Sequence, residues 1–130
     1  MTERLRKIAV FASGQGTNFQ AIADAVRTGE LDVELALLVC DKPGAPVIGR
    51  AERAGIETFV FRPRDYASKE AYEREIAAKL QELGVDLIVL AGYMRLVSPV
   101  LTEAYSGRII NVHPSILPAF PGKDAIGQAL

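Results

Sequence analysis

The sequence predicts an α/β protein with a Rossmann-like fold, an open and mostly parallel sheet with helices on both faces. Two observations carry this prediction. Short runs rich in Val, Ile, Leu and Phe alternate along the chain with segments of helical spacing. The runs are almost continuously apolar, which is typical of parallel strands that are covered on both faces. In such sheets ligands bind at the carboxyl ends of the strands, so the residues just after each run are the candidates for function.

The apolar runs are expected to form five strands joined by right-handed crossovers. They are Lys7–Ser13, Val33–Cys40, Glu57–Phe61, Asp86–Ala91 and Arg108–Val112.

Segments with helical spacing separate the runs. Phe19, Ile22 and Val26 lie on one face of a first helix that Gly29 can end. A weaker helix is predicted over Ala45–Ala54, with Gly55 after it.

The clearest helix covers Ser68–Leu83, with Ser68 as its cap and Gly84 as its end. Its apolar stripe is Tyr72, Ile76, Leu80 and Leu83, and its charged residues are expected to be solvated, namely Lys69, Glu70, Glu73, Arg74, Lys79 and Glu82. A further helix begins at Ser98-Pro99, a cap followed by proline at the first helical position. A short helix is predicted over Ala125–Leu130.

Length and charge exclude several classes of function. The 130 residues suit a single domain, and 15 Lys and Arg against 16 Asp and Glu leave a net charge of −1. A neutral chain without a basic run gives no surface for nucleic acid. No apolar stretch approaches the roughly 20 residues of a membrane-spanning helix. Cys40 is the single cysteine, so it is expected to be a buried small hydrophobe in a cytoplasmic protein.

The first candidate loop is Ser13-Gly14-Gln15-Gly16-Thr17-Asn18, between a strand and a helix. Glycines let the backbone approach a ligand closely, and the free N–H groups at a helix start attract phosphate. The loop is no dinucleotide fingerprint, because the third glycine would fall at Phe19. A compact monophosphate fits better, and the alternative is a tight turn that binds nothing.

The second loop, Gly92–Val97, follows the fourth strand. This loop could form a pocket wall with one polar anchor, from the apolar side chains of Met94, Leu96 and Val97 and the cation of Arg95. Taken alone, this stretch favours the plainer alternative that its apolar residues pack under the next helix.

The third and most specific stretch is Asn111–Gly122. Asn111 and His113 lie two residues apart and share a face of the fifth strand. An amide donor and an imidazole can together hold a carbonyl oxygen as it becomes an oxyanion. Prolines at positions 114, 118 and 121 then stiffen the loop.

Other chemistries are less well supported. One His and one Cys in different strands do not make a zinc site, so no metal is expected. A serine hydrolase lacks its Gly-x-Ser-x-Gly turn. Asp41 follows the second strand, where a Rossmann protein would hold a ribose hydroxyl, and this keeps a non-catalytic phosphate- or nucleotide-binding module as an alternative.

Together the three stretches SGQGTN, LAGYMRLVS and INVHPSILPAFPG resemble the phosphoribosylglycinamide formyltransferases, folate-dependent enzymes of purine biosynthesis. The resemblance implies transfer of a formyl group from 10-formyltetrahydrofolate to the amine of 5′-phosphoribosylglycinamide, without a metal. Gly16, Thr17 and Asn18 would hold the ribose phosphate. Asn111 would grip the formyl oxygen, and His113 would donate a proton to the tetrahedral intermediate.

The resemblance also implies a folate site formed by Lys69, Met94, Arg95, Leu96, Val97 and Asn111. Lys69 could equally be an ordinary solvated lysine. Family members continue past this point and carry an Asp that partners the catalytic His. No residue here matches that Asp, so we expect 1–130 to be one formyltransferase-like domain, incomplete at its C-terminus and with little or no activity alone.

Related folate enzymes remain as alternatives. A formyltetrahydrofolate hydrolase or a methionyl-tRNA formyltransferase would share Asn111 and His113, but neither needs SGQGTN as a phosphate site. The tRNA enzyme would also need a basic surface that this chain lacks. The sequence predicts no oligomeric state.

Overall fold

The computed structural model describes residues 6–112, which form a five-stranded sheet in the order β3-β2-β1-β4-β5. Every neighbouring pair of strands is parallel. The predicted fold class is therefore confirmed. The predicted helix Ala125–Leu130, the loop 114–122 and His113 lie outside the described residues.

The strands lie inside the predicted apolar runs, with ends trimmed by about a residue. They are β1 Lys7–Ala12, β2 Glu34–Cys40, β3 Thr58–Val60, β4 Leu87–Leu90 and β5 Ile109–Asn111. The central strand β1 pairs with β2 and β4, so that Val10 lies opposite Leu38 on one side and Val89 on the other.

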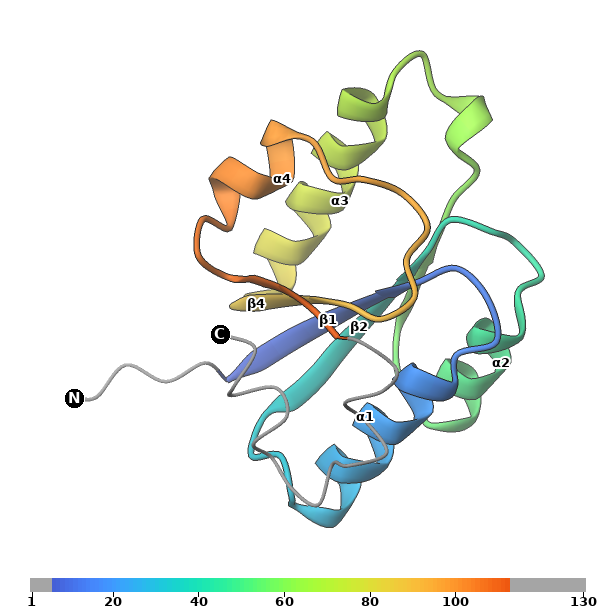
Figure 1. Cartoon of the computed structure of the whole chain (residues 1–130), viewed down its shortest axis with the longest axis vertical. Helices are drawn as coiled ribbons and strands as arrows, with labels where there is room; N and C mark the ends of the chain where they lie inside the picture. Colours follow the sequence, from blue (N-terminus) through green and yellow to red (C-terminus); the bar gives the residue numbers. More distant parts are fainter. Residues whose placement is uncertain (1–5, 113–130) are drawn as a thin grey trace.

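Helices cover both faces of the sheet (Figure 1). On one face, α1 (Thr17–Thr28) and α2 (Pro46–Arg53) pack against Ile8 and Val10 of β1. On the other, α3 (Lys69–Leu83) and α4 (Pro99–Ala104) pack against Ala9 and Phe11. The alternation of β1 side chains thus builds two cores, each dominated by Val, Ile, Leu and Ala, and this explains the continuous apolar run.

The helix ends follow the predicted caps. Ser68 accepts a hydrogen bond from Ala71 N at 3.1 Å, and Ser98 accepts one from Val100 N at 3.2 Å. Gly29 and Gly84 end α1 and α3 in the left-handed conformation, with φ of 88° and 73°. A short 3₁₀ turn, η1 (Pro63–Asp65), lies between β3 and α3 and was not predicted.

One prediction for α3 was wrong. Glu73 was expected to be solvated, but it is 1% exposed and faces the start of α4. Its carboxylate accepts hydrogen bonds from Ser98 N at 3.1 Å and from Ser98 Oγ at 2.6 Å. These donors replace water, so the polar side chain can lie beside the apolar stripe.

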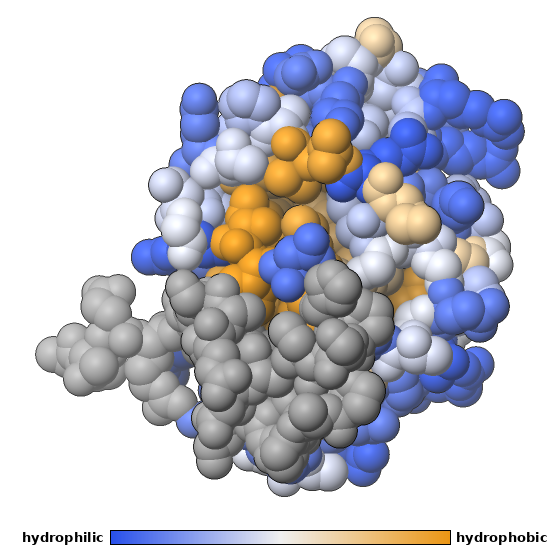
Figure 2. Space-filling model, in the orientation of Figure 1, coloured by the Kyte–Doolittle hydropathy of each residue, from blue (hydrophilic) through white to orange (hydrophobic). Residues whose placement is uncertain are grey.

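Because all the strands are parallel, their carboxyl ends meet at one edge of the sheet. The glycine-rich loop after β1, the loop after β4 and Asn111 at the end of β5 all belong to this edge. In the orientation of Figure 2, hydrophobic surface lies near the middle of the molecule, with hydrophilic residues above it and at its sides. None of the helices in residues 6–112 is long and apolar enough to cross a membrane.

Candidate functional site

The glycine-rich loop opens α1 without a side-chain cap. Gly16 is the N-cap residue, with φ of 82°, and no side chain within residues 6–112 caps the first turn. The N–H groups at this helix start are therefore available to an anion. They border a small cavity of about 160 Å³, lined by Gly14, Gln15, Gly16, Thr17, Asn18, Ala91 and Gly92. The predicted phosphate-binding residues are thus brought together with the start of the loop after β4.

Helix α2 holds this loop in place. Val47 N donates to Gly14 O at 3.0 Å, and Arg50 Nε donates to Gln15 O at 2.7 Å. Gly16 lies so close to α2 that a Cβ on it would come within 2.4 Å of Val47 Cγ2. The glycine is therefore required both by its positive φ and by this close approach.

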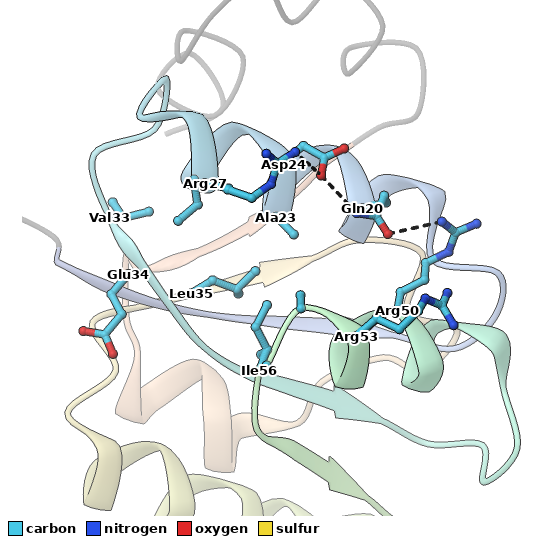
Figure 3. Close-up of a pocket in the computed structure, with 13 residues that line it drawn as sticks. Gln20, Ala23, Asp24, Arg27, Val33, Glu34, Leu35, Arg50, Arg53 and Ile56 are labelled. Carbon is cyan, nitrogen blue, oxygen red and sulfur yellow. Dashed lines mark hydrogen bonds and ion pairs between the residues drawn. The ribbon is translucent and has the colours of Figure 1, made fainter.

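Arg50 also contacts α1, since its Nη1 donates to Gln20 Oε1 at 3.3 Å (Figure 3). Gln20 in turn donates to Asp24 Oδ1 at 3.0 Å. These side chains line a larger cavity of about 840 Å³ between α1 and α2. That cavity shares no lining residue with the small cavity of the glycine-rich loop, so it is not part of the predicted site.

The loop after β4 is fixed by contacts to three other elements. Met94 N donates to Ser13 Oγ at 2.9 Å, which joins this loop to the glycine-rich loop. Arg95 Nε pairs with Asp41 Oδ2 at 2.9 Å, at the end of β2. Lys69 Nζ, at the start of α3, donates to Leu96 O at 2.6 Å. Lys69 therefore contacts the loop that carries most of the other predicted folate residues, and its role toward a folate stays a prediction.

The exposure of this loop contradicts the packing interpretation for two of its three apolar side chains. Met94 is 78% exposed and Leu96 is 83% exposed, so neither packs under the next helix. Val97 does pack against the core beneath α3 and α4. Two large apolar side chains are thus presented to solvent on a loop whose backbone is held in place, an arrangement suited to contact with an apolar ligand.

The ion pair of Arg95 and Asp41 joins a buried carboxylate to a half-exposed guanidinium. Asp41 is 1% exposed and Arg95 is 42% exposed, by side chain. The hydrogen bond to Asp41 raises the pKa of Arg95, so the guanidinium remains charged. Asp41 thus pairs with Arg95 through Oδ2, while its buried Oδ1 accepts no hydrogen bond within the described residues.

Burial raises the pKa of two further side chains at this edge. The ring of Tyr93 packs edge-on against Phe11 with centroids 5.2 Å apart, and burial raises the pKa of its hydroxyl. Cys40, at the end of β2, is fully buried as predicted, and burial raises the pKa of its thiol. Both side chains are therefore neutral near pH 7.

Asn111 is the last residue of β5 and is exposed, opposite Leu90 of β4. This places its amide at the carboxyl edge, as predicted. The arrangement of Asn111 with His113 stays a prediction, because His113 lies outside the described residues.

Sequence reasoning missed Arg50, Ser13 and Glu73 as residues that hold the site. Arg50 and the carbonyl of Gln15 are 35 positions apart, and Ser13 and Met94 are 81 apart. No local pattern reports such pairs. Within residues 6–112, no group of three or more His, Cys, Asp or Glu side chains could hold a metal ion.

The fold and this site define a Rossmann-like α/β domain with its candidate loops at the carboxyl edge, and comparison places it in a family. The chain belongs to the formyl transferase family, whose model matches residues 6–130.

Its relatives include phosphoribosylglycinamide formyltransferases. The chain is 54% identical over 125 residues to that of Bacillus subtilis (strain 168), covering 96% of this chain and 64% of the relative. It is 40% identical to that of Haemophilus influenzae, covering 97% of this chain and 59% of the relative. The chain therefore spans less than two thirds of the length of these relatives.

A solved structure shows the same fold. Glycinamide ribonucleotide transformylase 1 from Geobacillus kaustophilus is 60% identical, with a TM-score of 0.83 over 97% of this chain and 67% of that one. The Rossmann-like arrangement deduced from the apolar runs is therefore that of the family.

Proposed function

We propose that this chain serves the transfer of a formyl group from 10-formyltetrahydrofolate to the amine of 5′-phosphoribosylglycinamide. One observation carries the proposal: the bond from Met94 N to Ser13 Oγ joins the glycine-rich loop to the loop that presents Met94 and Leu96. The proposed phosphate site and the exposed apolar side chains of the second loop would thus lie side by side at the edge where β5 ends. The printed names of the relatives support the same reaction.

The phosphate of the ribonucleotide would bind at the start of α1. Gly16, Thr17 and Asn18 line the small cavity there, and the helix N-terminus lacks a side-chain cap. Backbone N–H groups and the positive end of the helix dipole both favour a dianion. The side chains of Thr17 and Asn18 add further donors.

The folate would lie along Met94, Arg95, Leu96 and Val97, with Lys69 at the border. The side chains of Met94 and Leu96 offer apolar contact, and the backbone of the loop offers donors and acceptors. Because Lys69, Ser13 and Asp41 hold this loop, little conformational entropy is lost on binding.

The chemistry would take place at Asn111 and His113. The amine nitrogen of the ribonucleotide attacks the formyl carbon, and the carbonyl oxygen becomes an oxyanion that the Asn111 amide and a protonated His113 can stabilise. The bond from the carbon to N10 of the folate then breaks, N10 gains a proton and the amine loses one. Holding both substrates on one edge supplies much of the acceleration.

Binding and turnover together test the proposal. We expect calorimetry to show both ligands bound to the chain at once. Thr17→Ala with Asn18→Ala should weaken only the ribonucleotide, and Lys69→Ala should weaken only the folate. Any amine-dependent turnover should fall about 10²- to 10³-fold in Asn111→Ala and in His113→Ala.

Two results would contradict the proposal. Deformylation of 10-formyltetrahydrofolate that does not depend on the amine would indicate a hydrolase. Binding of the ribonucleotide without any binding of folate would indicate a phosphate-binding module.

A further inference from the structure

Helix α3 contacts the end of the second loop at two points that lie one helical turn apart on the helix. Lys69 Nζ donates a hydrogen bond to Leu96 O at 2.6 Å. Glu73, four positions later on the same face of α3, accepts hydrogen bonds from Ser98, the residue that follows the loop. The two contacts therefore fix the loop backbone on both sides of Val97.

The contact between Glu73 and Ser98 is buried and uses both oxygens of the carboxyl group. Glu73 is 1% exposed and Ser98 is 7% exposed. Glu73 Oε1 and Oε2 each accept a hydrogen bond from Ser98 N at 3.1 Å, and Oε1 also accepts one from Ser98 Oγ at 2.6 Å. Ser98 Oγ accepts a further bond from Val100 N at 3.2 Å, in the first turn of α4. One carboxyl group thus ties the end of the second loop and the start of α4 to α3.

Packing alone gives no reason for an acidic residue at position 73. Burying a carboxyl group costs free energy that an apolar side chain in its place would not cost. The start of α4 has its own cap, since the hydroxyl of Ser98 accepts the bond from Val100 N. A buried polar group whose oxygens both have partners instead fixes the positions of the groups that it joins. Glu73 joins α3 to the backbone that carries the exposed side chains of the second loop.

The second loop needs such a hold, because it exposes apolar side chains. Met94 is 78% exposed and Leu96 is 83% exposed, whereas Val97 packs against the core beneath α3 and α4. An apolar side chain gains free energy when it leaves water, so a free loop would turn Leu96 inward. Lys69 donates to the carbonyl group before Val97 and Glu73 accepts from the N–H group after it, and a rotation of the backbone would break both contacts.

We propose that Glu73 is a positioning residue of the proposed folate site, and that it acts through Ser98 to keep Met94 and Leu96 presented to the ligand. The inference rests on the proposed function, because it takes the folate as the ligand of the second loop. Glu73 itself is buried and would not touch the folate. Its loss should weaken folate binding and leave the phosphate site unchanged, because α2 holds the glycine-rich loop independently.

Calorimetry on the chain with tetrahydrofolate and, separately, with 5′-phosphoribosylglycinamide tests the proposal. Glu73→Ala should bind tetrahydrofolate about tenfold more weakly, because the loop loses the buried bonds that hold it, and should bind the ribonucleotide within about twofold of the parent. Glu73→Gln keeps the size and one acceptor but turns an NH₂ donor toward Ser98 N. It should therefore lose part of the folate affinity, and it decides the test if Glu73→Ala does not fold. Folate affinity within about twofold of the parent in every variant that folds would overturn the proposal.

Leu80→Ala separates a positioning role from a general loss of stability. Leu80 lies further along α3 and is fully buried, so its truncation should lower the urea midpoint at least as much as Glu73→Ala does. Its affinity for tetrahydrofolate should stay within about twofold of the parent. Glu70→Ala, at an exposed position of α3, controls for the removal of a glutamate and should change neither quantity. An equal fall of folate affinity in Leu80→Ala and Glu73→Ala would overturn the proposal.

Hydrogen exchange of the backbone amides follows the second loop without any ligand. In Glu73→Ala the amides of residues 94–98 should exchange about tenfold faster than in the parent, while those of residues 17–20 keep the rate of the parent. If this happens and the parent chain binds no folate, the hold of Glu73 on the loop stands and the proposed function fails. Unchanged exchange over residues 94–98 would overturn the proposal, whatever ligand binds.

Discussion

At the scale of single residues, Gly16 is the position where the site depends most on having no side chain. Its φ is 82°, and a Cβ would lie 2.4 Å from Val47 Cγ2 and 2.9 Å from the backbone Cα of Val47. We expect Gly16→Ala to lower the free energy of unfolding by about 1–3 kcal/mol, because it adds a left-handed alanine and a steric clash with α2.

Urea denaturation measures this loss, and Gly14→Ala is the matched control. Gly14 lies in the same loop, without a positive φ, and a Cβ there meets nothing within 4 Å. An equal loss in both variants would mean that the close contact with Val47 is not the cause.

Glu73 is a buried acidic residue, and its hydrogen-bond partners in the described part of the chain all belong to Ser98. We expect Ser98→Ala to lower the free energy of unfolding by about 2–3 kcal/mol, since the carboxylate loses its hydroxyl donor and α4 loses its cap. Thr102→Ala, at an exposed position of α4, should change it by less than about 0.5 kcal/mol. Thermal unfolding compares the two variants. Similar losses of stability would mean that the contact between Ser98 and Glu73 does not stabilise the fold.

Cys40 gives a pH-dependent readout of the core. Burial raises the pKa of its thiol above the ordinary 9.0, so the folded state favours the neutral form. The stability from this preference is complete below pH 9.0 and is lost as pH rises through the raised pKa. We expect alkylation of the native chain by iodoacetamide to stay slow up to pH 9.0 and to become fast in urea. Rapid alkylation of the native chain at pH 8 would show that the end of β2 opens.

At the scale of elements, α2 positions the glycine-rich loop through Arg50. Its Nε donates to Gln15 O at 2.7 Å, next to the proposed phosphate site. We expect Arg50→Ala to weaken binding of 5′-phosphoribosylglycinamide about tenfold, because the loop loses a charged donor that fixes its backbone. Arg50→Lys should recover part of the affinity, since an ammonium can reach one acceptor but not both.

Calorimetry with the ribonucleotide measures this effect, and Arg53→Ala is the control on the same helix. The free energy of unfolding is followed in parallel. If Arg50→Ala destabilises the chain without changing the affinity, Arg50 is only a structural link between α1 and α2.

Local sequence patterns predicted the elements but not the contacts between them. Helix caps can be recognised from residue type, because serine favours helix starts and glycine favours helix ends. The ends of α1 and α3 and the start of α4 could therefore be predicted from Gly29, Ser68, Gly84 and Ser98. Glu73 looks like any solvated helix residue, because its partner lies 25 positions away.

In the candidate site, too, the elements could be predicted from the sequence but the contacts between them could not. The glycines and the order of the motifs indicated which loops meet at the carboxyl edge. The bonds that hold the loops, such as Lys69 to Leu96 and Arg95 to Asp41, join residues 27 and 54 positions apart. Only the fold brings these residues into contact, so these contacts could not be predicted from any one stretch.

At the scale of the whole molecule, the sheet separates two cores that share its strands. Ile22 of α1 belongs to the core that contains Val10, and Ile76 of α3 belongs to the core that contains Phe11. Both isoleucines are fully buried. Because the sheet lies between the two cores, the two side chains do not touch.

We therefore expect Ile22→Val and Ile76→Val each to lower the free energy of unfolding by about 1 kcal/mol and to add in the double variant within about 0.5 kcal/mol. A double-mutant cycle in urea measures the coupling between the two faces. The matched comparison is Ile76→Val with Leu80→Ala, two changes in one core, where contact through a shared cavity should produce a larger coupling. A coupling above about 1 kcal/mol between Ile22 and Ile76 would mean that the strands transmit repacking from one face to the other. The two faces could then no longer be treated as independent supports for the loops at the carboxyl edge.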